Sequence, residues 1–181
     1  MSGDIFMKKY IRKTITVFAL FLAAGSAATG VLMAQEENKK TGFEISFHHI
    51  GISVKDLDES IAWYKEMLGF EEVMRMNQGE TIQNMKIGHI QRGNIYIELF
   101  QVAESRPLPE YRRDPNEDLR VQGIKHFGLQ VDDAHAAVEE LKAKGVEIAM
   151  EPIDTPGVCF VFIRDNSGNA FELIEYKNQQ Q

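Results

Sequence analysis

The chain has 181 residues, of which 44% are hydrophobic and 26% are charged, a composition that suits one globular domain or two small modules with a shared core. Its formal net charge is −7, and it carries no basic patch of the kind that nucleic-acid-binding proteins use, which argues against a nucleic-acid partner. The single cysteine, Cys159, leaves no second cysteine for an internal disulfide, and its apolar neighbours indicate a small buried hydrophobe.

Residues 1–34 have the order of a secretory signal peptide, with a basic patch, an apolar stretch over 15–34 and then a polar run. The alternative is an uncleaved anchor helix, since about 20 apolar residues can span a bilayer. We expect cleavage and export, to the bacterial periplasm. Removal of four positive charges and one negative charge changes the net charge from −7 to −10, which argues against anionic membranes as partners of the mature chain.

Residues 43–176 contain one pattern twice, which indicates an internal repeat. Each copy opens with a strand-like segment, 47–54 or 124–131, in which a histidine stands two residues before a glycine. An amphipathic helix follows each segment, over 57–68 in the first copy and 134–144 in the second. Asp56 is the expected N-cap of the first helix and Gly69 its end, and Asp132 or Asp133 and Gly145 have these roles in the second. The further strands are expected at 71–76, 83–90, 95–102, 147–152, 159–164 and 170–176.

The sequence therefore predicts an α+β chain of two βαβββ modules, preceded by a signal peptide and a polar linker over 35–42. The modules are expected at 43–102 and 124–176. Between them, 103–123 is interpreted as a long loop because it has three prolines and no clear periodicity. Its arginines could meet an anionic substrate, but a solvated linker is the favoured interpretation. The tail, 177–181, is expected to be frayed.

Four residues occupy matching positions in the two copies: His49 and His126 in the opening strands, and Glu98 and Glu172 in the closing strands. The histidine and the glutamate are 49 residues apart in the first copy and 46 apart in the second. A carboxylate on an otherwise apolar strand face is costly to bury unpaired, and a divalent cation would offset its charge. Two imidazoles and two carboxylates suit Zn²⁺, Ni²⁺, Co²⁺, Mn²⁺ or Fe²⁺ better than Ca²⁺. The four residues are the predicted metal ligands.

Strand alternation places further residues on the faces that carry these ligands. Glycines 51 and 128 should leave room for a substrate or water beside the metal. The expected substrate-binding residues are Ser53, Tyr96, Gln130 and Arg164. His48 should point to the face opposite His49. We interpret it as structural or exposed, and extend that interpretation to His89 and His135, which have no counterpart in the other copy.

These segments resemble the vicinal oxygen chelate superfamily, also called the glyoxalase, bleomycin-resistance and dioxygenase superfamily. The resemblance covers residues 43–176, and the segments that carry it are His49–Tyr64, Met67–Phe70, Lys125–Asp133 and Phe162–Glu175. It implies a fold in which the two βαβββ modules form a cup-shaped mixed sheet around a metal ion. Among the subfamilies, the His/Glu/His/Glu set is most similar to bacterial glyoxalase I, a lactoylglutathione lyase.

The resemblance implies a lyase or isomerase in which the metal chelates two oxygens of a substrate and Glu172 or Glu98 moves a proton next to a carbonyl group. An exported enzyme would meet little glutathione, so the substrate is left open. The alternatives are an exported binding or resistance-type protein without turnover, a methylmalonyl-CoA epimerase-like isomerase, and an extradiol-type dioxygenase that uses His49, His126 and Glu172. In this superfamily the site is completed within one chain or across a homodimer, and the sequence does not choose.

Overall fold

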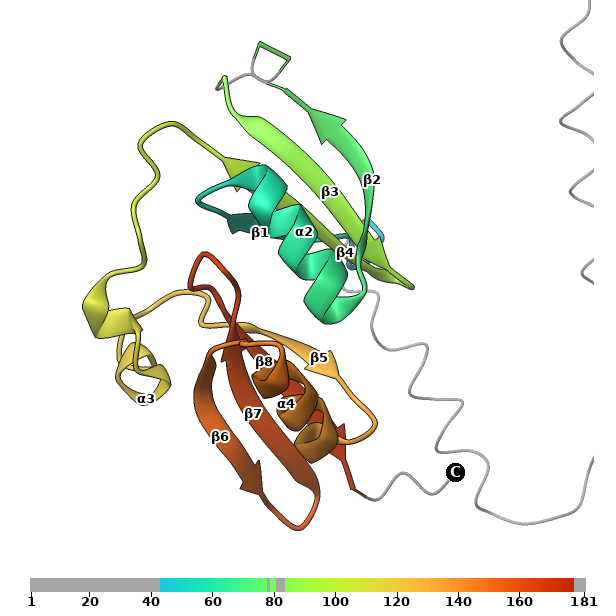
Figure 1. Ribbon diagram of the computed structural model, residues 1–181, viewed down its shortest axis with the longest axis vertical. Helices are drawn as coiled ribbons and strands as arrows, with labels where there is room; N and C mark the ends of the chain where they lie inside the picture. The colour runs from blue at the N-terminus through green and yellow to red at the C-terminus, as the bar shows by residue number, and fades with distance from the viewer. Residues whose placement is uncertain (1–42, 78, 81–83, 178–181) are drawn as a thin grey trace, which may run out of the picture. The chain divides into compact units, whose positions relative to one another are not determined.

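The computed structural model describes residues 43–77, 79–80 and 84–177 (Figure 1). The predicted signal peptide and the linker over 35–42 lie outside the described residues, and so does the predicted tail over 177–181 except for Lys177. Within the described part of the chain, no helix is long and apolar enough to cross a membrane.

The described chain has the predicted order of elements, βαβββ twice (Figure 1). The first module contains β1 (Ile50–Ser53), α2 (Leu57–Leu68), β2 (Glu71–Met76), β3 (Lys86–Arg92) and β4 (Ile95–Gln101). The second contains β5 (Phe127–Gln130), α4 (Ala134–Ala143), β6 (Ile148–Asp154), β7 (Val158–Arg164) and β8 (Ala170–Tyr176). The sheet orders are β1-β4-β3-β2 and β5-β8-β7-β6, so the two modules share one topology. In each sheet the first strand is parallel to the last, and the other pairs are antiparallel.

The ends of the two helices are set by residues that satisfy the free backbone groups there, through a side chain at the start and through the backbone at the end of α2. The Asp56 carboxylate accepts a hydrogen bond from the Glu59 N–H at 2.9 Å, and Gly69 ends α2 in the left-handed conformation with φ +66°. Asp133, one of the two predicted candidates, caps α4 by accepting from the Ala136 N–H at 2.8 Å. The predicted bounds of α2 are confirmed, and α4 is one residue shorter than predicted.

Two predictions of local structure were wrong. The opening strands are shorter than expected: β1 begins at Ile50, where its ladder to β4 begins, and β5 begins at Phe127. The two histidines therefore lie just before their strands. The segment 103–123 is not a plain loop, because it contains a 3₁₀ turn (Glu110–Arg112) and α3 (Pro115–Asp118).

Ion pairs hold this connecting segment together. Arg112 donates to both oxygens of the buried Asp118 carboxylate, at 2.7 and 3.1 Å, and to the Ile124 carbonyl at 3.0 Å. Arg113 lies 3.5 Å from Glu147, and Arg120 lies 3.7 Å from Glu117. Three of its four arginines thus contact carboxylates, two within the segment and one in the second module. The interpretation of a solvated linker is therefore replaced by that of a segment that is tied together internally and to the second module.

One hydrophobic core joins the two modules on the helix side of both sheets. Tyr64 of α2 and Phe171 of β8 are both fully buried, and their ring centroids are 5.7 Å apart. The Tyr64 hydroxyl donates to the Asp165 carboxylate at 3.0 Å, and this carboxylate also accepts from the Ser167 and Asn169 N–H groups of the turn between β7 and β8. A polar contact between modules is thereby enclosed in the core, where an unmade hydrogen bond is costly.

This junction makes the stability of the fold pH-dependent. Burial raises the pKa of Asp165 above its ordinary value of 3.8, so the native state holds the proton more tightly than the unfolded chain. The contribution of that proton is complete below the unfolded pKa and is lost as the pH rises through the raised native pKa. We expect the free energy of unfolding of the native chain, minus that of Asp165→Asn, to decrease as the pH rises from 4. Urea titrations at several pH values measure this difference, and an increase with pH would contradict the assignment.

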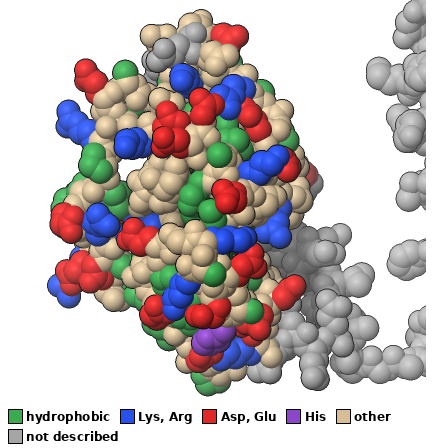
Figure 2. All heavy atoms as spheres, in the orientation of Figure 1, with side chains coloured by type: hydrophobic (Ala, Val, Ile, Leu, Met, Phe, Trp, Pro, Cys, Tyr) green, Lys and Arg blue, Asp and Glu red, His purple; other side chains and the backbone are tan. Residues whose placement is uncertain are grey.

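On the face drawn in Figure 2, acidic and basic side chains are interspersed. Exposed ion pairs of the described chain include Lys65–Glu71 at 2.7 Å and Lys144–Glu140 at 2.6 Å. Such solvated pairs add little stability each, so the shared core and its buried junction are the main stabilising features of the fold.

Candidate metal site

The structure brings the predicted ligands together as two pairs, one in each module. His49 Nε2 lies 3.1 Å from Glu98 Oε2, and His126 Nε2 lies 3.6 Å from Glu172 Oε2. The pairs arise in the same way, because strand pairing places Gly51 beside Glu98 and Gly128 beside Glu172, two residues after each histidine. The four side chains are 18–37% exposed, so they are partly dehydrated and still accessible.

The two carboxylates have different neighbours. In the first module His89 Nε2 lies 3.0 Å from Glu98 Oε1, and His89 Nδ1 lies 2.8 Å from the Tyr96 hydroxyl. In the second module the strand position that faces Glu172 is occupied by Phe162, an aromatic residue that cannot hold a carboxylate. Among the described residues, Glu98 thus contacts two imidazoles, whereas Glu172 contacts one, that of His126, at 3.6 Å.

Two of the histidines interpreted as structural or exposed therefore lie in the site. His89 is only 13% exposed and contacts Glu98 directly. His48 does not point away from His49: their Nδ1 atoms are 2.7 Å apart, and the His48 ring packs edge-on against Tyr96. Strand alternation does not apply to His48, because both histidines precede β1 and no ladder fixes the direction of their side chains.

The two ligand pairs lie on sheet faces that point away from the shared core. In β4 Glu98 alternates with the buried Ile97 and Leu99, and in β8 Glu172 alternates with the buried Phe171 and Leu173. Those buried residues form the core between the modules, so each carboxylate is on the opposite face of its sheet. Among the described residues, no compact ligand group combines the two pairs. A single chain thus carries two separate His/Glu pairs, His49 with Glu98 and His126 with Glu172, which are called the first and second half-sites below.

A cavity of about 340 Å³ lies beside the second half-site. Its walls include His126, Phe160 and Phe162, with Leu119 from the connecting segment and Lys125 from the start of the second module. The His126 ring packs edge-on against Phe162 with their centroids 4.8 Å apart. A volume of this size, with apolar walls and a few polar groups, is suited to a small molecule. Phe160 and Phe162 alternate with buried core residues of β7, but residues 158–163 are all apolar, so the sequence carries no alternation that distinguishes the cavity face from the core face.

The predicted substrate-binding residues lie in three kinds of environment. Tyr96 is part of the first half-site through its contacts with His89 and His48. Ser53 and Gln130 are exposed on the same strand faces as Gly51 and Gly128. A Cβ on Gly51 would lie 3.0 Å from the Phe100 ring, and one on Gly128 would lie 3.4 Å from the Glu172 carboxylate, so both glycines allow a close approach beside the half-sites.

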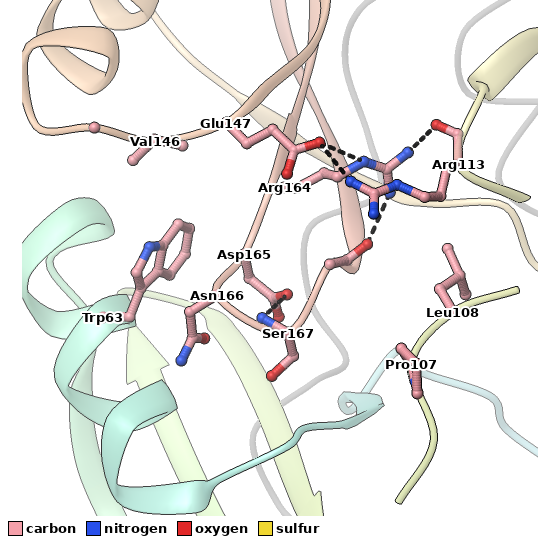
Figure 3. Close-up of a pocket in the computed structure, with 12 residues that line it drawn as sticks. Trp63, Pro107, Leu108, Arg113, Val146, Glu147, Arg164, Asp165, Asn166 and Ser167 are labelled. Carbon is pink, nitrogen blue, oxygen red and sulfur yellow. Dashed lines mark hydrogen bonds and ion pairs between the residues drawn. The ribbon is translucent and has the colours of Figure 1, made fainter. Parts of the chain in front are cut away.

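Arg164 is only 3% exposed and holds the connecting segment against the second module. Its guanidinium donates to the Gly168 carbonyl at 2.7 Å and to the Arg113 carbonyl, and it lies 3.4 Å from Glu147 (Figure 3). Figure 3 shows these groups around a second cavity, of about 450 Å³, which Trp63 of α2 also lines. Most of the Arg164 donors are therefore occupied by the protein itself, and its role toward a substrate stays a prediction.

Comparison with known proteins identifies the family. The model of the Glyoxalase/Bleomycin resistance protein/Dioxygenase superfamily matches residues 46–173, which include both modules. The chain belongs to this superfamily. A crystal structure of a glyoxalase family protein from Enterococcus faecalis has the same fold, with a TM-score of 0.60 and 23% identity over 72% of this chain and 97% of that one.

Several curated proteins are similar to this member of the superfamily. The uncharacterized protein YwkD of Bacillus subtilis is 35% identical over 72% of this chain and 96% of its own length. A probable chloroplastic lactoylglutathione lyase of Arabidopsis thaliana is 29% identical over 70% of this chain, which spans 35% of that protein. A mitochondrial methylmalonyl-CoA epimerase of Dictyostelium discoideum is 30% identical over 73% of this chain and 77% of its own length.

Proposed function

We propose that this chain is a metal-dependent lyase or isomerase of the glyoxalase I type, which moves a proton between neighbouring carbons of a small vicinal dioxygen substrate. The observation that carries the proposal is the pair of matching His/Glu half-sites, His49 with Glu98 and His126 with Glu172, at separations of 3.1 and 3.6 Å. Similarity to proteins named lactoylglutathione lyase supports it. A protein that only binds a ligand would not need an intact histidine and glutamate in each of the two half-sites.

The donor atoms present fit a divalent transition metal. Each half-site offers one imidazole nitrogen and one carboxylate oxygen at a separation that two ligands of one ion can have, given bonds of about 2.0–2.2 Å. When bound, such an ion supplies Lewis-acid stabilisation of negative charge on substrate oxygens. The identity of the metal, among Ni, Zn, Co, Mn and Fe, is not fixed by this donor set.

We propose further that two copies of the chain complete the site. Each half-site of one chain is on the face of its own sheet that points away from the shared core, so His49 and Glu98 of one copy would combine with His126 and Glu172 of another. Two-fold pairing of copies is the commonest arrangement of oligomers, and it would form two equivalent sites. Each site would then contain the apolar cavity beside His126 as its substrate pocket.

Of the two carboxylates, Glu172 is the one that we propose as the proton-transferring base. His49 and His89 both hold Glu98, at 3.1 and 3.0 Å, and restrict its movement. Glu172 has the aromatic Phe162 in place of the second histidine, so its carboxylate is less restricted than that of Glu98. His126, its partner at 3.6 Å, lines the cavity in which the substrate would lie. It would accept a proton from a carbon next to a carbonyl group and return it to the neighbouring carbon.

A substrate screen tests this function. The purified chain, loaded with each candidate metal in turn, is incubated with 2-oxoaldehyde hemithioacetals of several thiols and with acyl thioesters. Turnover of at least one class, abolished by a chelator and restored by the metal, is the expected result. Tight binding of these compounds without turnover under any metal would instead identify a binding protein, and oxygen consumption with a catechol would identify a dioxygenase.

A further inference from the structure

A second cluster of metal-ligating side chains lies in the second module, away from the half-site. It consists of His135 in the first turn of α4, Asp154 at the end of β6 and Cys159 in β7. One potential ligand atom of each residue lies within 4.8 Å of those of the other two. His135 Nε2 lies 2.9 Å from Asp154 Oδ2, and Asp154 and Cys159 are partners in the β6–β7 ladder. Residues distant in sequence are thus gathered at one point.

This cluster is separate from the candidate metal site already described. Cys159 is fully buried and alternates in β7 with Phe160 and Phe162, which line the cavity beside His126. The thiol is therefore on the helix side of the sheet, whereas His126 and Glu172 belong to the other side. His135 and Asp154 are 58% and 50% exposed, so the cluster has a buried wall and an open side.

We propose that His135, Asp154 and Cys159 form a second binding site for a borderline or soft divalent metal ion of the Zn²⁺ class. One thiolate, one imidazole and one carboxylate are three ligands that such ions accept, and the open side leaves a fourth position for water. The thiolate disfavours Ca²⁺ and Mg²⁺, which bind oxygen ligands. An ion at this point would tie the first turn of α4 to the β6–β7 hairpin.

One neighbouring cation opposes metal binding. The Lys177 ammonium contacts Asp154 Oδ1, so it competes for the carboxylate and adds a positive charge beside the cluster. Burial raises the pKa of the Cys159 thiol, which keeps it protonated and unreactive until a metal displaces the proton. Replacing Lys177 should therefore tighten metal binding, and this sign distinguishes a metal site from a structural hydrogen-bond cluster.

Co²⁺ is the probe, because a thiolate ligand gives it a near-ultraviolet charge-transfer band that nitrogen and oxygen ligands do not give. Cys159 is the only cysteine in the sequence, so the band reports on this cluster alone. The full chain should develop the band as Co²⁺ is added, and His126→Ala/Glu172→Ala should keep it. The proposal therefore stands or falls independently of the proposed function.

Three variants test the site, two at proposed ligands and one at the competing lysine. Cys159→Ser should lose the band, His135→Ala should shift its midpoint to at least about tenfold higher Co²⁺, and Lys177→Met should shift it to lower Co²⁺. His135 and Lys177 are at the surface, so their replacement leaves the core intact even if Cys159→Ser fails to fold. A band absent from both the native chain and Lys177→Met at millimolar Co²⁺, or one unchanged by His135→Ala, would overturn the proposal.

Discussion

Replacing Glu172 by Gln is expected to reduce the turnover number for a hemithioacetal substrate by about 10²–10⁴-fold, the usual contribution of a positioned general base. Gln has nearly the same shape and still offers an oxygen, but it cannot accept the proton. In its own half-site Glu172 is paired with His126 and faces Phe162 across the sheet. Neither is a carboxylate that could take over the role of Glu172 as the base. Steady-state kinetics with the metal content of each preparation measured in parallel separates loss of the base from loss of the metal.

Glu98→Gln is the matched control, because Glu98 occupies the same repeat position but is held by His49 and His89. We expect it to weaken metal binding more than it lowers the turnover of the metal-loaded protein. If Glu98→Gln abolished turnover while Glu172→Gln did not, the assignment of the base would be reversed. If both variants kept full turnover, the proton-transfer function itself would be contradicted.

Phe171→Ala is expected to lower the free energy of unfolding by about 3–5 kcal/mol, as deletion of a large buried aromatic ring does. Phe171 is fully buried, and its ring contacts the rings of Trp63, Tyr64 and Phe127 within centroid distances of 4.6–6.1 Å. Since two of these rings belong to the other module, the variant removes packing from the junction as well as from its own sheet.

Urea denaturation monitored by circular dichroism measures the loss. Phe47→Ala is the control, because Phe47 is 72% exposed and its removal should change the free energy of unfolding by no more than about 0.5 kcal/mol. A loss below about 1.5 kcal/mol for Phe171→Ala would show that the core between the modules tolerates a cavity there and contributes little to stability.

The fold was predictable because its signals are local and occur twice. The Asp56 cap and Gly69 end define α2 without reference to any other segment, and the repeat then transfers the same interpretation to α4. The repeat also predicted the two His/Glu pairs, since strand order alone places each glutamate beside the segment that carries its histidine. The connecting segment was misjudged because its helices depend on the ion pair between Arg112 and Asp118, which no periodicity reveals.

The repeat predicts only the features that the two modules share, so it gives no information on the residues that differ between them. The counterpart of His89 is Phe162, so the repeat gives no signal for His89. Yet the contact between His89 and Glu98 is what distinguishes the surroundings of Glu98 from those of Glu172. The cluster of His135, Asp154 and Cys159 depends on three elements meeting in space, so none of the three residues was distinctive in the sequence. Export to the periplasm depends on residues outside the described part of the chain and stays a prediction.

The most direct test of the central claim, a metal site shared between two copies, is the metal content of a mixed preparation. His49→Ala/Glu98→Ala destroys the first half-site, and His126→Ala/Glu172→Ala destroys the second. Both variants, and the chain with native half-sites that serves as their reference, carry His135→Ala so that the second cluster does not add to the metal content. Each variant alone should then retain almost no tightly bound transition metal. Unfolded and refolded together, the two should regain about a quarter of the metal content of the reference chain, because half of randomly paired dimers are mixed and each has one intact site. A mixture that binds no more metal than its separate components would contradict a site shared between copies.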